Sequence, residues 1–427
     1  MPVRDFESIR KIVEDFFGGA TFSIVRKYTA PRQIEKGDNV LVKRITTELV
    51  TYHFVLERNG LPFTDTERKI ADEVAEAFRI FFINRNKGGD IIYFRTVLFS
   101  SLLDVSISRF LSSNRHRAFW SIQKVLQILR NLSFQKYEGK PATTGFIVYR
   151  NQTEEFNVAC SMSDCLRLDF NPGIGISANF FKSPSTYLLV NGLGTYYASN
   201  INMQASGMIK FMNYGNRDAI ERLSMRDTLT LLKKAGEGAF AASITPASEL
   251  EVLTCPDNIS VWRKGNWSLY DPDIFRSFLT GHLYAKEIES LIATAYSLSK
   301  LRLGAIVLIA DENVLVSGDL QKGTASGKDT LSKLIISFFK NKTISDLKHS
   351  GELISILSSD GMTLFNKEGV LVDAGIIINT CTTPGLVMGG GRTTAATAAS
   401  LYGKVIKVSE DGPVELYESG KCIYRFG

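Results

Sequence analysis

Residues 288–310, IESLIATAYSLSKLRLGAIVLIA, combine a helical pattern with a strand pattern that follows it directly. In the first part, apolar residues recur at positions 288, 291, 292, 295 and 298, which is the spacing of one helix face. After Gly304 comes the uninterrupted apolar run Ala305–Ile309, typical of a strand that is buried on both faces. A helix that leads straight into such a strand predicts an α/β domain, in which helices cover a sheet.

The residues that follow continue this alternation towards the C-terminus. The elements that we predict are helices at 331–339 and 352–357, a hairpin of strands 363–365 and 370–372, a helix that ends near 402, a strand at 404–408, and a closing hairpin through 411–412. We therefore predict a C-terminal domain over residues 284–427, built as a mixed twisted sheet flanked by helices. Its length of about 140 residues is usual for one domain.

The upstream chain divides into two regions. Thr64-Asp65-Thr66-Glu67 has the capping-box pattern, in which Thr64 caps the helix that follows and the Glu67 side chain reaches back to it. With further helical patterns downstream, it predicts a mostly helical N-terminal region over residues 1–143. Residues 144–283 contain short strand-like runs, among them Tyr187–Val190, and a single long helix near Asp218–Lys234. They predict a β-rich α+β module, which we interpret as one that binds a ligand or a partner.

Composition and charge exclude several classes of protein. With 44% hydrophobic and 22% charged residues in 427, the chain is typical of folded globular proteins. The net charge of +6 is compatible with anionic ligands but too small to predict nucleic-acid binding. The sequence has no apolar run of membrane-spanning length and no signal-peptide pattern, and its five cysteines favour a reducing compartment. We therefore expect a cytoplasmic protein that is not in a membrane.

A second segment points to the ligand: Gly389–Thr394, GGGRTT, which runs into the predicted small-residue helix. Glycines let bare backbone approach an anion, and the first N–H groups of a helix point at it without intrahelical partners. A guanidinium at this junction can hold phosphate through two hydrogen bonds. The alternative is a flexible loop with close helix–sheet packing, although so many polar groups exceed what packing needs. The phosphate-binding residues that we expect are Gly390, Gly391, Arg392, Thr393 and Thr394.

Two acidic positions flank this segment. Asp360-Gly361 stands where a helix gives way to a strand, and Ser409-Glu410 follows the strand 404–408. Asp-Gly is among the commonest turn dipeptides, so on its own this position is well explained as a turn. The nearby phosphate-binding segment favours a functional role, because carboxylates can bring a metal ion to phosphate.

With these motifs, the C-terminal third resembles the catalytic domain of the diadenylate cyclases, the family that condenses two ATP into cyclic di-AMP. The resemblance covers about residues 284–425. It is carried, in order, by 288–313 (IESLIATAYSLSKLRLGAIVLIADEN), 351–379 (GELISILSSDGMTLFNKEGVLVDAGIIIN), 390–396 (GGRTTAA) and 404–420 (KVIKVSEDGPVELYESG). The Asp-Gly-Ala, Gly-x-Arg-His-Arg and Ser-Glu motifs of the family match Asp360-Gly361-Met362, Gly390–Thr394 and Ser409-Glu410.

The resemblance implies a role for each of these positions. Asp360 would be a catalytic carboxylate and, with Glu410, would bind a divalent metal, Mg²⁺ or Mn²⁺. The carboxylate and metal would activate a ribose 3′-hydroxyl for attack on the α-phosphate of a second ATP, and Arg392 would be the other catalytic residue. The nucleotide site would also include Gly361, Met362 and Ser409. Because two ATP molecules must face each other, the resemblance also implies a homo-oligomer with ATP or a related nucleotide as its ligand.

The chain departs from the family pattern at three of these positions. Met362 replaces an alanine, and Thr393 and Thr394 replace a histidine and the second arginine. Threonine hydroxyls can donate to phosphate but carry no charge, and charge stabilisation is often the largest catalytic contribution. Two functions stay open. The chain is either a diadenylate-cyclase-type enzyme or a catalytically degenerate protein that binds or senses a nucleotide or cyclic dinucleotide. For the enzyme, the resemblance implies control by an N-terminal sensor region, with residues 144–283 as the sensor module.

Overall fold

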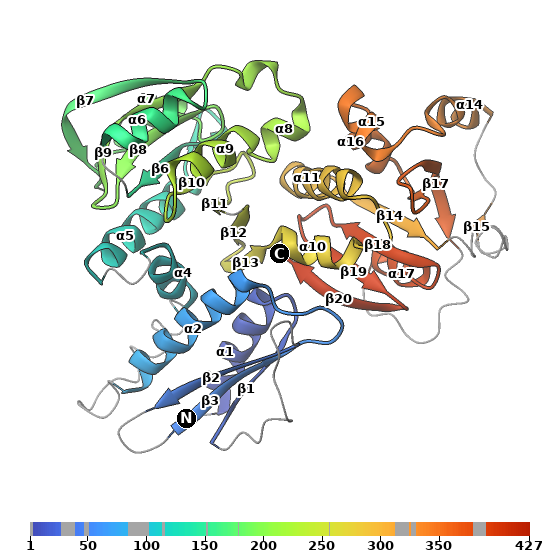
Figure 1. The fold of residues 1–427 in the computed structure, drawn as a ribbon, viewed down its shortest axis with the longest axis horizontal. Helices are drawn as coiled ribbons and strands as arrows, with labels where there is room; N and C mark the ends of the chain where they lie inside the picture. The colour runs from blue at the N-terminus through green and yellow to red at the C-terminus, as the bar shows by residue number, and fades with distance from the viewer. Residues whose placement is uncertain are drawn as a thin grey trace. The chain divides into compact units, whose positions relative to one another are not determined.

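The computed structural model describes residues 3–26, 39–46, 51–83, 102–112, 116–150, 153–177, 179–255, 257–311, 324–325, 330–378 and 390–427. Both large sheets contain parallel and antiparallel pairs and are accompanied by helices, so the fold is mixed α/β (Figure 1). The chain forms two compact units. The first contains Met1–Asn216 and Met225–Asp271, and the second contains Arg217–Ser224 and Pro272–Gly427.

The second unit is built on a seven-stranded mixed sheet, with the order β15-β17-β16-β14-β18-β19-β20. Its central strand β14 (Ala305–Ala310) is parallel to β16 (Met362–Phe365) and antiparallel to β18 (Gly403–Val408). The other strands, each antiparallel to its neighbours, are β15 (Thr324–Ala325), β17 (Leu371–Ile378), β19 (Val414–Glu418) and β20 (Lys421–Phe426). The predicted mixed sheet is confirmed.

Helices cover both faces of this sheet because both faces are apolar. On one face, the alanines of α17 (Gly391–Ala399) pack against Ile306 and Leu308 of β14. Successive residues of a strand point to opposite faces, so the buried Val307 and Ile309 point to the other face. There α11 (Ala285–Leu301) packs on β18 and β19. The other described helices of this unit are α8 (Ala219–Leu223), α10 (Pro272–Leu279), α14 (Thr330–Phe339), α15 (Ile344–Ser350) and α16 (Leu353–Leu357).

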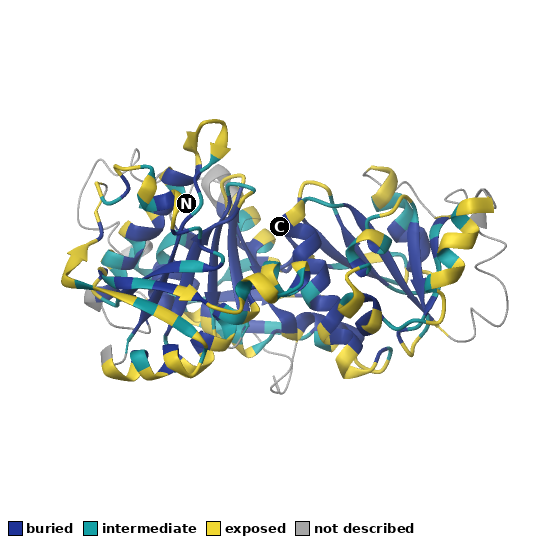
Figure 2. Ribbon diagram, turned by 90° about the horizontal axis from the view of Figure 1, so that it is seen from above, coloured by how far each residue is buried: buried dark blue, intermediate teal, exposed yellow. Residues whose placement is uncertain are grey.

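Helix α14 forms where its apolar spacing predicts a helix, but its apolar side chains are exposed. Leu331, Leu334 and Phe338 each keep more than 60% of their surface accessible. In the sheet, by contrast, strands β14, β16 and β19 are almost entirely buried (Figure 2). No helix in the described part of the chain is long and apolar enough to cross a membrane.

The first unit contains two principal sheets. A three-stranded antiparallel sheet has the order β1-β3-β2, and an eight-stranded mixed sheet has the order β13-β12-β11-β10-β6-β8-β9-β7. In the larger sheet β6 and β8 are parallel, and the other neighbours are antiparallel. The strands are β1 (Thr21–Val25), β2 (Val40–Thr46), β3 (Thr51–Glu57), β6 (Gly145–Tyr149), β7 (Cys165–Gly175), β8 (Thr195–Asn200), β9 (Gln204–Phe211), β10 (Phe240–Ile244), β11 (Leu250–Thr254), β12 (Asn258–Arg263) and β13 (Asn266–Tyr270).

One hydrophobic core joins these sheets with the helices of the first unit. It includes Phe54 of β3, Phe146 of β6, Leu250 of β11 and Ile122 of α5. The helices are α1 (Val3–Phe16), α2 (Asp65–Ile83), α4 (Leu102–Ser112), α5 (His116–Ser133), α6 (Thr153–Ser161), α7 (Ser185–Leu188) and α9 (Arg226–Ala235). Residues on both sides of the predicted boundary at 143/144 contribute to this core, and the three-region division stays a prediction.

The predicted capping box at the start of α2 is confirmed. The Glu67 N–H donates to Thr64 Oγ1 at 3.1 Å, and the Thr64 N–H donates to Glu67 Oε2 at 2.9 Å. These two bonds satisfy backbone donors that have no partner inside the helix, which is why α2 begins at this point.

Two predictions for the middle region are wrong. Tyr187–Val190 is not a strand, because Pro184 stands at the N-cap of the one-turn helix α7. The predicted helix over 218–234 is two helices, α8 and α9, which are separated at Met225. The backbone of Met225 is left-handed, with φ of 62°, and a right-handed helix cannot continue through that conformation.

Candidate functional site

The N-terminus of α17 lies where the phosphate-binding segment was predicted. The Gly390 carbonyl accepts from the N–H groups of Thr393 at 2.9 Å and Thr394 at 3.2 Å, which starts the helix. A Cβ added at Gly390 or Gly391 would meet no atom within 4 Å, so the backbone here borders open space. Gly389 lies outside the described residues. This arrangement leaves room for an anion to approach the first turn of the helix.

The Arg392 side chain links this turn to the end of the central strands. Its Nη1 forms a 2.8 Å ion pair with Glu410 Oε1, and both side chains are partly exposed. The guanidinium also lies across Gly304, where a Cβ would be only 2.6 Å from Arg392 Cζ. With any other residue at position 304, the Arg392 guanidinium would have to move away. The sequence analysis identified Gly304 only as the residue before the strand, and its role under Arg392 was missed.

Strand register places Asp360 at the same end of the sheet. Val307 pairs with Thr363, and Ala305 pairs with Val408. If both registers are continued past the strand ends, Gly304 lies between Asp360 and Ser409. Asp360 therefore lies at the same end of the sheet as Gly304, and Arg392 and the Ser409-Glu410 turn lie beside Gly304. No hydrogen bond or ion pair joins Asp360 to Arg392 within the described residues.

The turns that carry the two carboxylates are held by local hydrogen bonds. Asp360 is exposed, and its Oδ1 accepts from the Gly361 N–H at 3.0 Å. The Ser409 N–H donates to the Pro413 carbonyl at 2.8 Å, which closes the turn that presents Glu410. Met362, a predicted site residue, is buried in the core under α17. Its side chain packs against apolar neighbours rather than facing a ligand.

Beneath the first turn of α17 lies a buried charged network. Lys407 of β18 donates through Nζ to Thr393 Oγ1 at 2.8 Å and to Glu415 Oε2 at 2.6 Å. The Tyr417 hydroxyl also donates to Glu415 Oε2, at 2.7 Å. Burial and the adjacent Glu415 raise the pKa of Tyr417 well above its usual value, so the phenol keeps its proton. Thr394 instead donates to the Gly390 carbonyl at 3.4 Å. Sequence reasoning missed Lys407, although a lysine inside the apolar strand VIKV was a signal.

The carboxylates are compatible with a metal ion that arrives with a nucleotide. No cluster of three or more His, Cys, Asp or Glu side chains suited to a metal occurs among the described residues. Mg²⁺ in nucleotide sites usually takes only one or two carboxylates, and phosphate and water oxygens complete its shell. Asp360 offers one such carboxylate. Glu410 is the predicted second, and its ion pair with Arg392 would have to open first.

The backbone conformation and close packing of Gly361, at this end of the sheet, can be tested by substitution. Its φ is +92°, and a Cβ there would lie 2.8 Å from the Gly375 carbonyl carbon of β17. We expect Gly361→Ala to lower the free energy of unfolding by about 1–2 kcal/mol or more. Gly391→Ala is the matched control, because a Cβ there meets no atom and alanine favours a helix by up to about 1 kcal/mol. Denaturant unfolding followed by circular dichroism measures both, and equal stability of the two variants would contradict the assignment.

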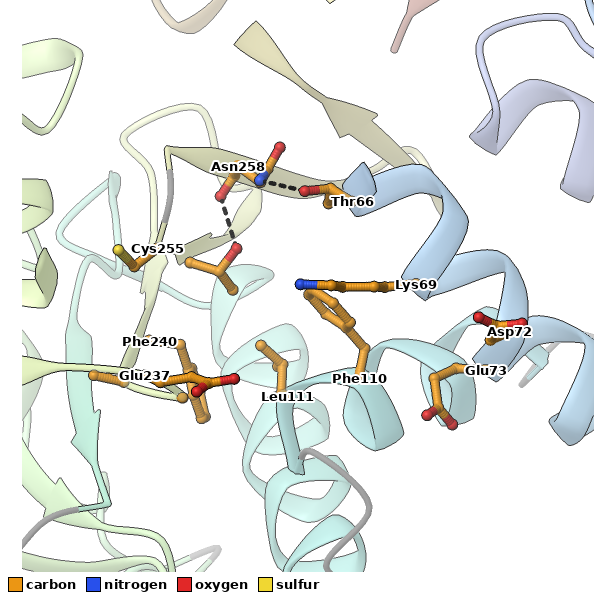
Figure 3. Close-up of a pocket in the computed structure, with 13 residues that line it drawn as sticks. Thr66, Lys69, Asp72, Glu73, Phe110, Leu111, Glu237, Phe240, Cys255 and Asn258 are labelled. Atoms are coloured by element: carbon orange, nitrogen blue, oxygen red, sulfur yellow. Dashed lines mark hydrogen bonds between the residues drawn. The ribbon is translucent and has the colours of Figure 1, made fainter. Parts of the chain in front are cut away.

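The first unit contains a pocket of about 320 Å³, near the lower end of the usual range for small-molecule sites (Figure 3). Phe110 and Leu111 of α4 and Phe240 of β10 supply apolar walls. On the opposite wall, Asn258 Nδ2 donates to Thr66 Oγ1 at 2.8 Å. Lys69 reaches from α2 towards the Phe110 ring.

The charges that line this pocket differ in their pairing. Asp72 forms a 2.6 Å ion pair with Lys43, and Glu73 forms one of 2.7 Å with Arg109. Lys69 has no ion-pair partner among the residues that the structure describes. Glu237 also lines the pocket and likewise has no ion pair within the described part of the chain. The pocket therefore presents one cation and one carboxylate beside apolar walls, and its charges do not by themselves select an anionic or a cationic ligand.

No protein-family model and no curated protein matches this chain in sequence.

Proposed function

We propose that residues 284–427 form a diadenylate-cyclase-type nucleotidyltransferase domain, which condenses two ATP into cyclic di-AMP or a related dinucleotide. One observation carries the proposal. Asp360, Arg392 and Ser409-Glu410, which come from three separate segments, lie at one end of the sheet, where Arg392 lies against Gly304 and pairs with Glu410. Glycine backbone at the start of α17 borders open space beside them. Carboxylate, guanidinium and helix N-terminus are the groups that nucleotide phosphates and their metal require.

In the proposed reaction each of these residues would have a separate role. The first turn of α17 binds phosphate oxygens through its N–H groups, and Arg392 exchanges Glu410 for a phosphate through charge-assisted hydrogen bonds. Asp360 lies where it can orient a ribose 3′-hydroxyl and accept its proton directly or through water. A bound Mg²⁺ or Mn²⁺ would neutralise phosphate charge and lower the pKa of that hydroxyl. The hydroxyl oxygen forms a bond to the α-phosphorus of the second ATP, and pyrophosphate leaves.

The alternative is a protein of the same fold that binds a nucleotide or cyclic dinucleotide without turning it over. The contacts of Thr393 and Thr394 favour it. Both side chains are uncharged and form hydrogen bonds within the protein, Thr393 with Lys407 and Thr394 with Gly390, so neither side chain itself brings a cation into contact with the ligand. Under either function, we propose that the first unit acts as the sensor and that the pocket at Lys69 binds its ligand.

The deciding experiment is incubation of the purified full chain with ATP and either Mg²⁺ or Mn²⁺, followed by mass spectrometry for cyclic di-AMP and other dinucleotides. Product formation supports the enzyme. If no dinucleotide forms with either metal but ATP still raises the melting temperature, the binding protein is supported instead. If no dinucleotide forms and neither ATP nor cyclic di-AMP raises the melting temperature, both functions are overturned. Because condensation needs two facing sites, we also expect light scattering to detect a dimer when product forms.

Arg392→Ala should weaken ATP binding under either function. Loss of a charge-assisted hydrogen bond costs about 1.5–3 kcal/mol, which corresponds to roughly a tenfold to hundredfold rise in Kd. Arg276→Ala is the control, because Arg276 of α10 also forms ion pairs, with Glu289 at 2.6 Å and Asp273 at 2.7 Å. Isothermal titration calorimetry with ATP measures both variants. Unchanged affinity of the Arg392 variant would remove the phosphate site from the proposal.

A further inference from the structure

Lys407 is a buried cation in a position that packing alone does not require. It lies on the same face of β18 as Val405, which belongs to the apolar core under α17. Only 5% of Lys407 is exposed. An ammonium group costs several kcal/mol to bury unless it is paired and hydrogen-bonded, whereas an apolar residue in this position would cost nothing of the kind. Core packing therefore does not explain why a lysine occupies position 407.

The ion pair with Glu415 explains how the charge is tolerated. Glu415 also accepts from the Tyr417 hydroxyl and lies 3.4 Å from Arg425 Nε. These contacts hold the Glu415 carboxylate in place on β19. They do not explain the second bond of Lys407, which leaves the sheet and joins the first turn of α17 at Thr393.

That second bond determines how the Thr393 hydroxyl can be used. A hydroxyl has one hydrogen to donate, and Thr393 Oγ1 already accepts from the Lys407 ammonium at 2.8 Å. Its own hydrogen must therefore point away from Lys407. A hydroxyl that accepts from a cation is polarised and becomes a stronger donor. Thr393 is only partly buried and follows Arg392 directly, so an acceptor that binds to this turn can reach the hydroxyl.

We propose that Lys407 is a positioning residue, which holds the Thr393 hydroxyl so that it donates to a phosphate oxygen of the bound nucleotide. The inference rests on the proposed phosphate site at α17 and assigns two further residues to it. It also gives the Arg392-Thr393 sequence a physical role. The buried Lys407 of β18 supplies the positive charge. It polarises the Thr393 hydroxyl, which donates to the ligand.

The test is calorimetric titration of the full chain with two probes, Mg²⁺–ATP and adenosine, which has no phosphate. Thr393→Val and Lys407→Met should each weaken ATP affinity roughly threefold to tenfold, the usual effect of one hydrogen bond. The double variant should lose no more ATP affinity than the weaker-binding of the two single variants, because both changes remove the same interaction. Thr393→Ser keeps the hydroxyl and should bind ATP as the wild type does. Adenosine affinity should stay unchanged in every variant.

Several results would overturn the inference. If the losses in ATP-binding free energy of Thr393→Val and Lys407→Met add in full in the double variant, the two residues act independently of each other. If adenosine affinity falls in parallel with ATP affinity, they act on folding or on binding of the base instead. If Lys407→Met does not fold, the pair Thr393→Val and Thr393→Ser decides, because both keep Lys407. Unchanged ATP affinity in Thr393→Val, with Arg392→Ala impaired, refutes this inference alone. Unchanged affinity in Arg392→Ala refutes the phosphate site itself and this inference with it.

Discussion

Replacing Asp360 by asparagine is expected to abolish dinucleotide formation while folding is retained. The Asp360 side chain is exposed, and its Oδ1 accepts a 3.0 Å hydrogen bond from the Gly361 N–H. Asparagine keeps an acceptor oxygen for this bond, so the turn before β16 should survive. It loses the negative charge that binds a divalent cation and the basicity that accepts a proton. General-base catalysis alone contributes on the order of 10²- to 10⁴-fold, so we expect the rate to fall by at least that factor.

Product yield by mass spectrometry, together with melting temperature, measures the effect of Asp360→Asn. Glu368→Gln is the matched control, because Glu368 is also exposed, lies in the turn between β16 and β17, and undergoes the same change of charge. Wild-type yield from Asp360→Asn would remove this carboxylate from the chemistry. If the wild-type chain binds ATP without turning it over, the same variant should abolish the Mg²⁺ dependence of ATP affinity, and an unaltered dependence would contradict the assignment.

Replacing Glu67 by alanine should destabilise the first unit by about 3–5 kcal/mol, the usual effect of breaking a buried ion pair. Glu67 accepts from Arg58 Nη1 at 2.7 Å and Nη2 at 2.9 Å, and the two side chains are 0% and 2% exposed. It also accepts from the Thr64 N–H and so completes the cap of α2. Alanine would leave the Arg58 cation buried without its carboxylate and the N–H without its acceptor.

Denaturant unfolding followed by tryptophan fluorescence isolates this effect, because Trp120, Trp262 and Trp267 all belong to the first unit. Glu76→Ala is the control on the same helix. Its ion pair with Arg79 is about one-third exposed, and such pairs contribute about 1 kcal/mol or less. The double change Arg58→Met with Glu67→Leu should recover much of the lost stability, since no charge is then buried. Equal losses for the Glu67 and Glu76 variants would refute the importance of the buried pair.

Local patterns predicted those elements whose causes lie within a few residues. The capping box at Thr64 and Glu67 was predicted because both partners are three positions apart. The central strand was predicted from its apolar run, which is long enough to be unambiguous. Tyr187–Val190 was mistaken for a strand, since four apolar residues fit a helical turn equally well. The break at Met225 carries no local signal, because methionine has no preference for a left-handed backbone.

The sequence alone was sufficient to predict a mixed α/β fold and to name Asp360, Arg392 and Glu410 as candidates, since periodicity and short motifs depend on neighbours in the chain. Only the tertiary structure decided which of them meet and what lies beneath them. The Arg392 guanidinium lies against Gly304, which is 88 positions earlier in the sequence. The Lys407 ammonium of β18 donates to Thr393 Oγ1 of α17. Those contacts depend on the register of β14 with β16 and β18 and on the packing of α17. Register and packing are set by the burial of both faces of the whole sheet, which no short segment encodes.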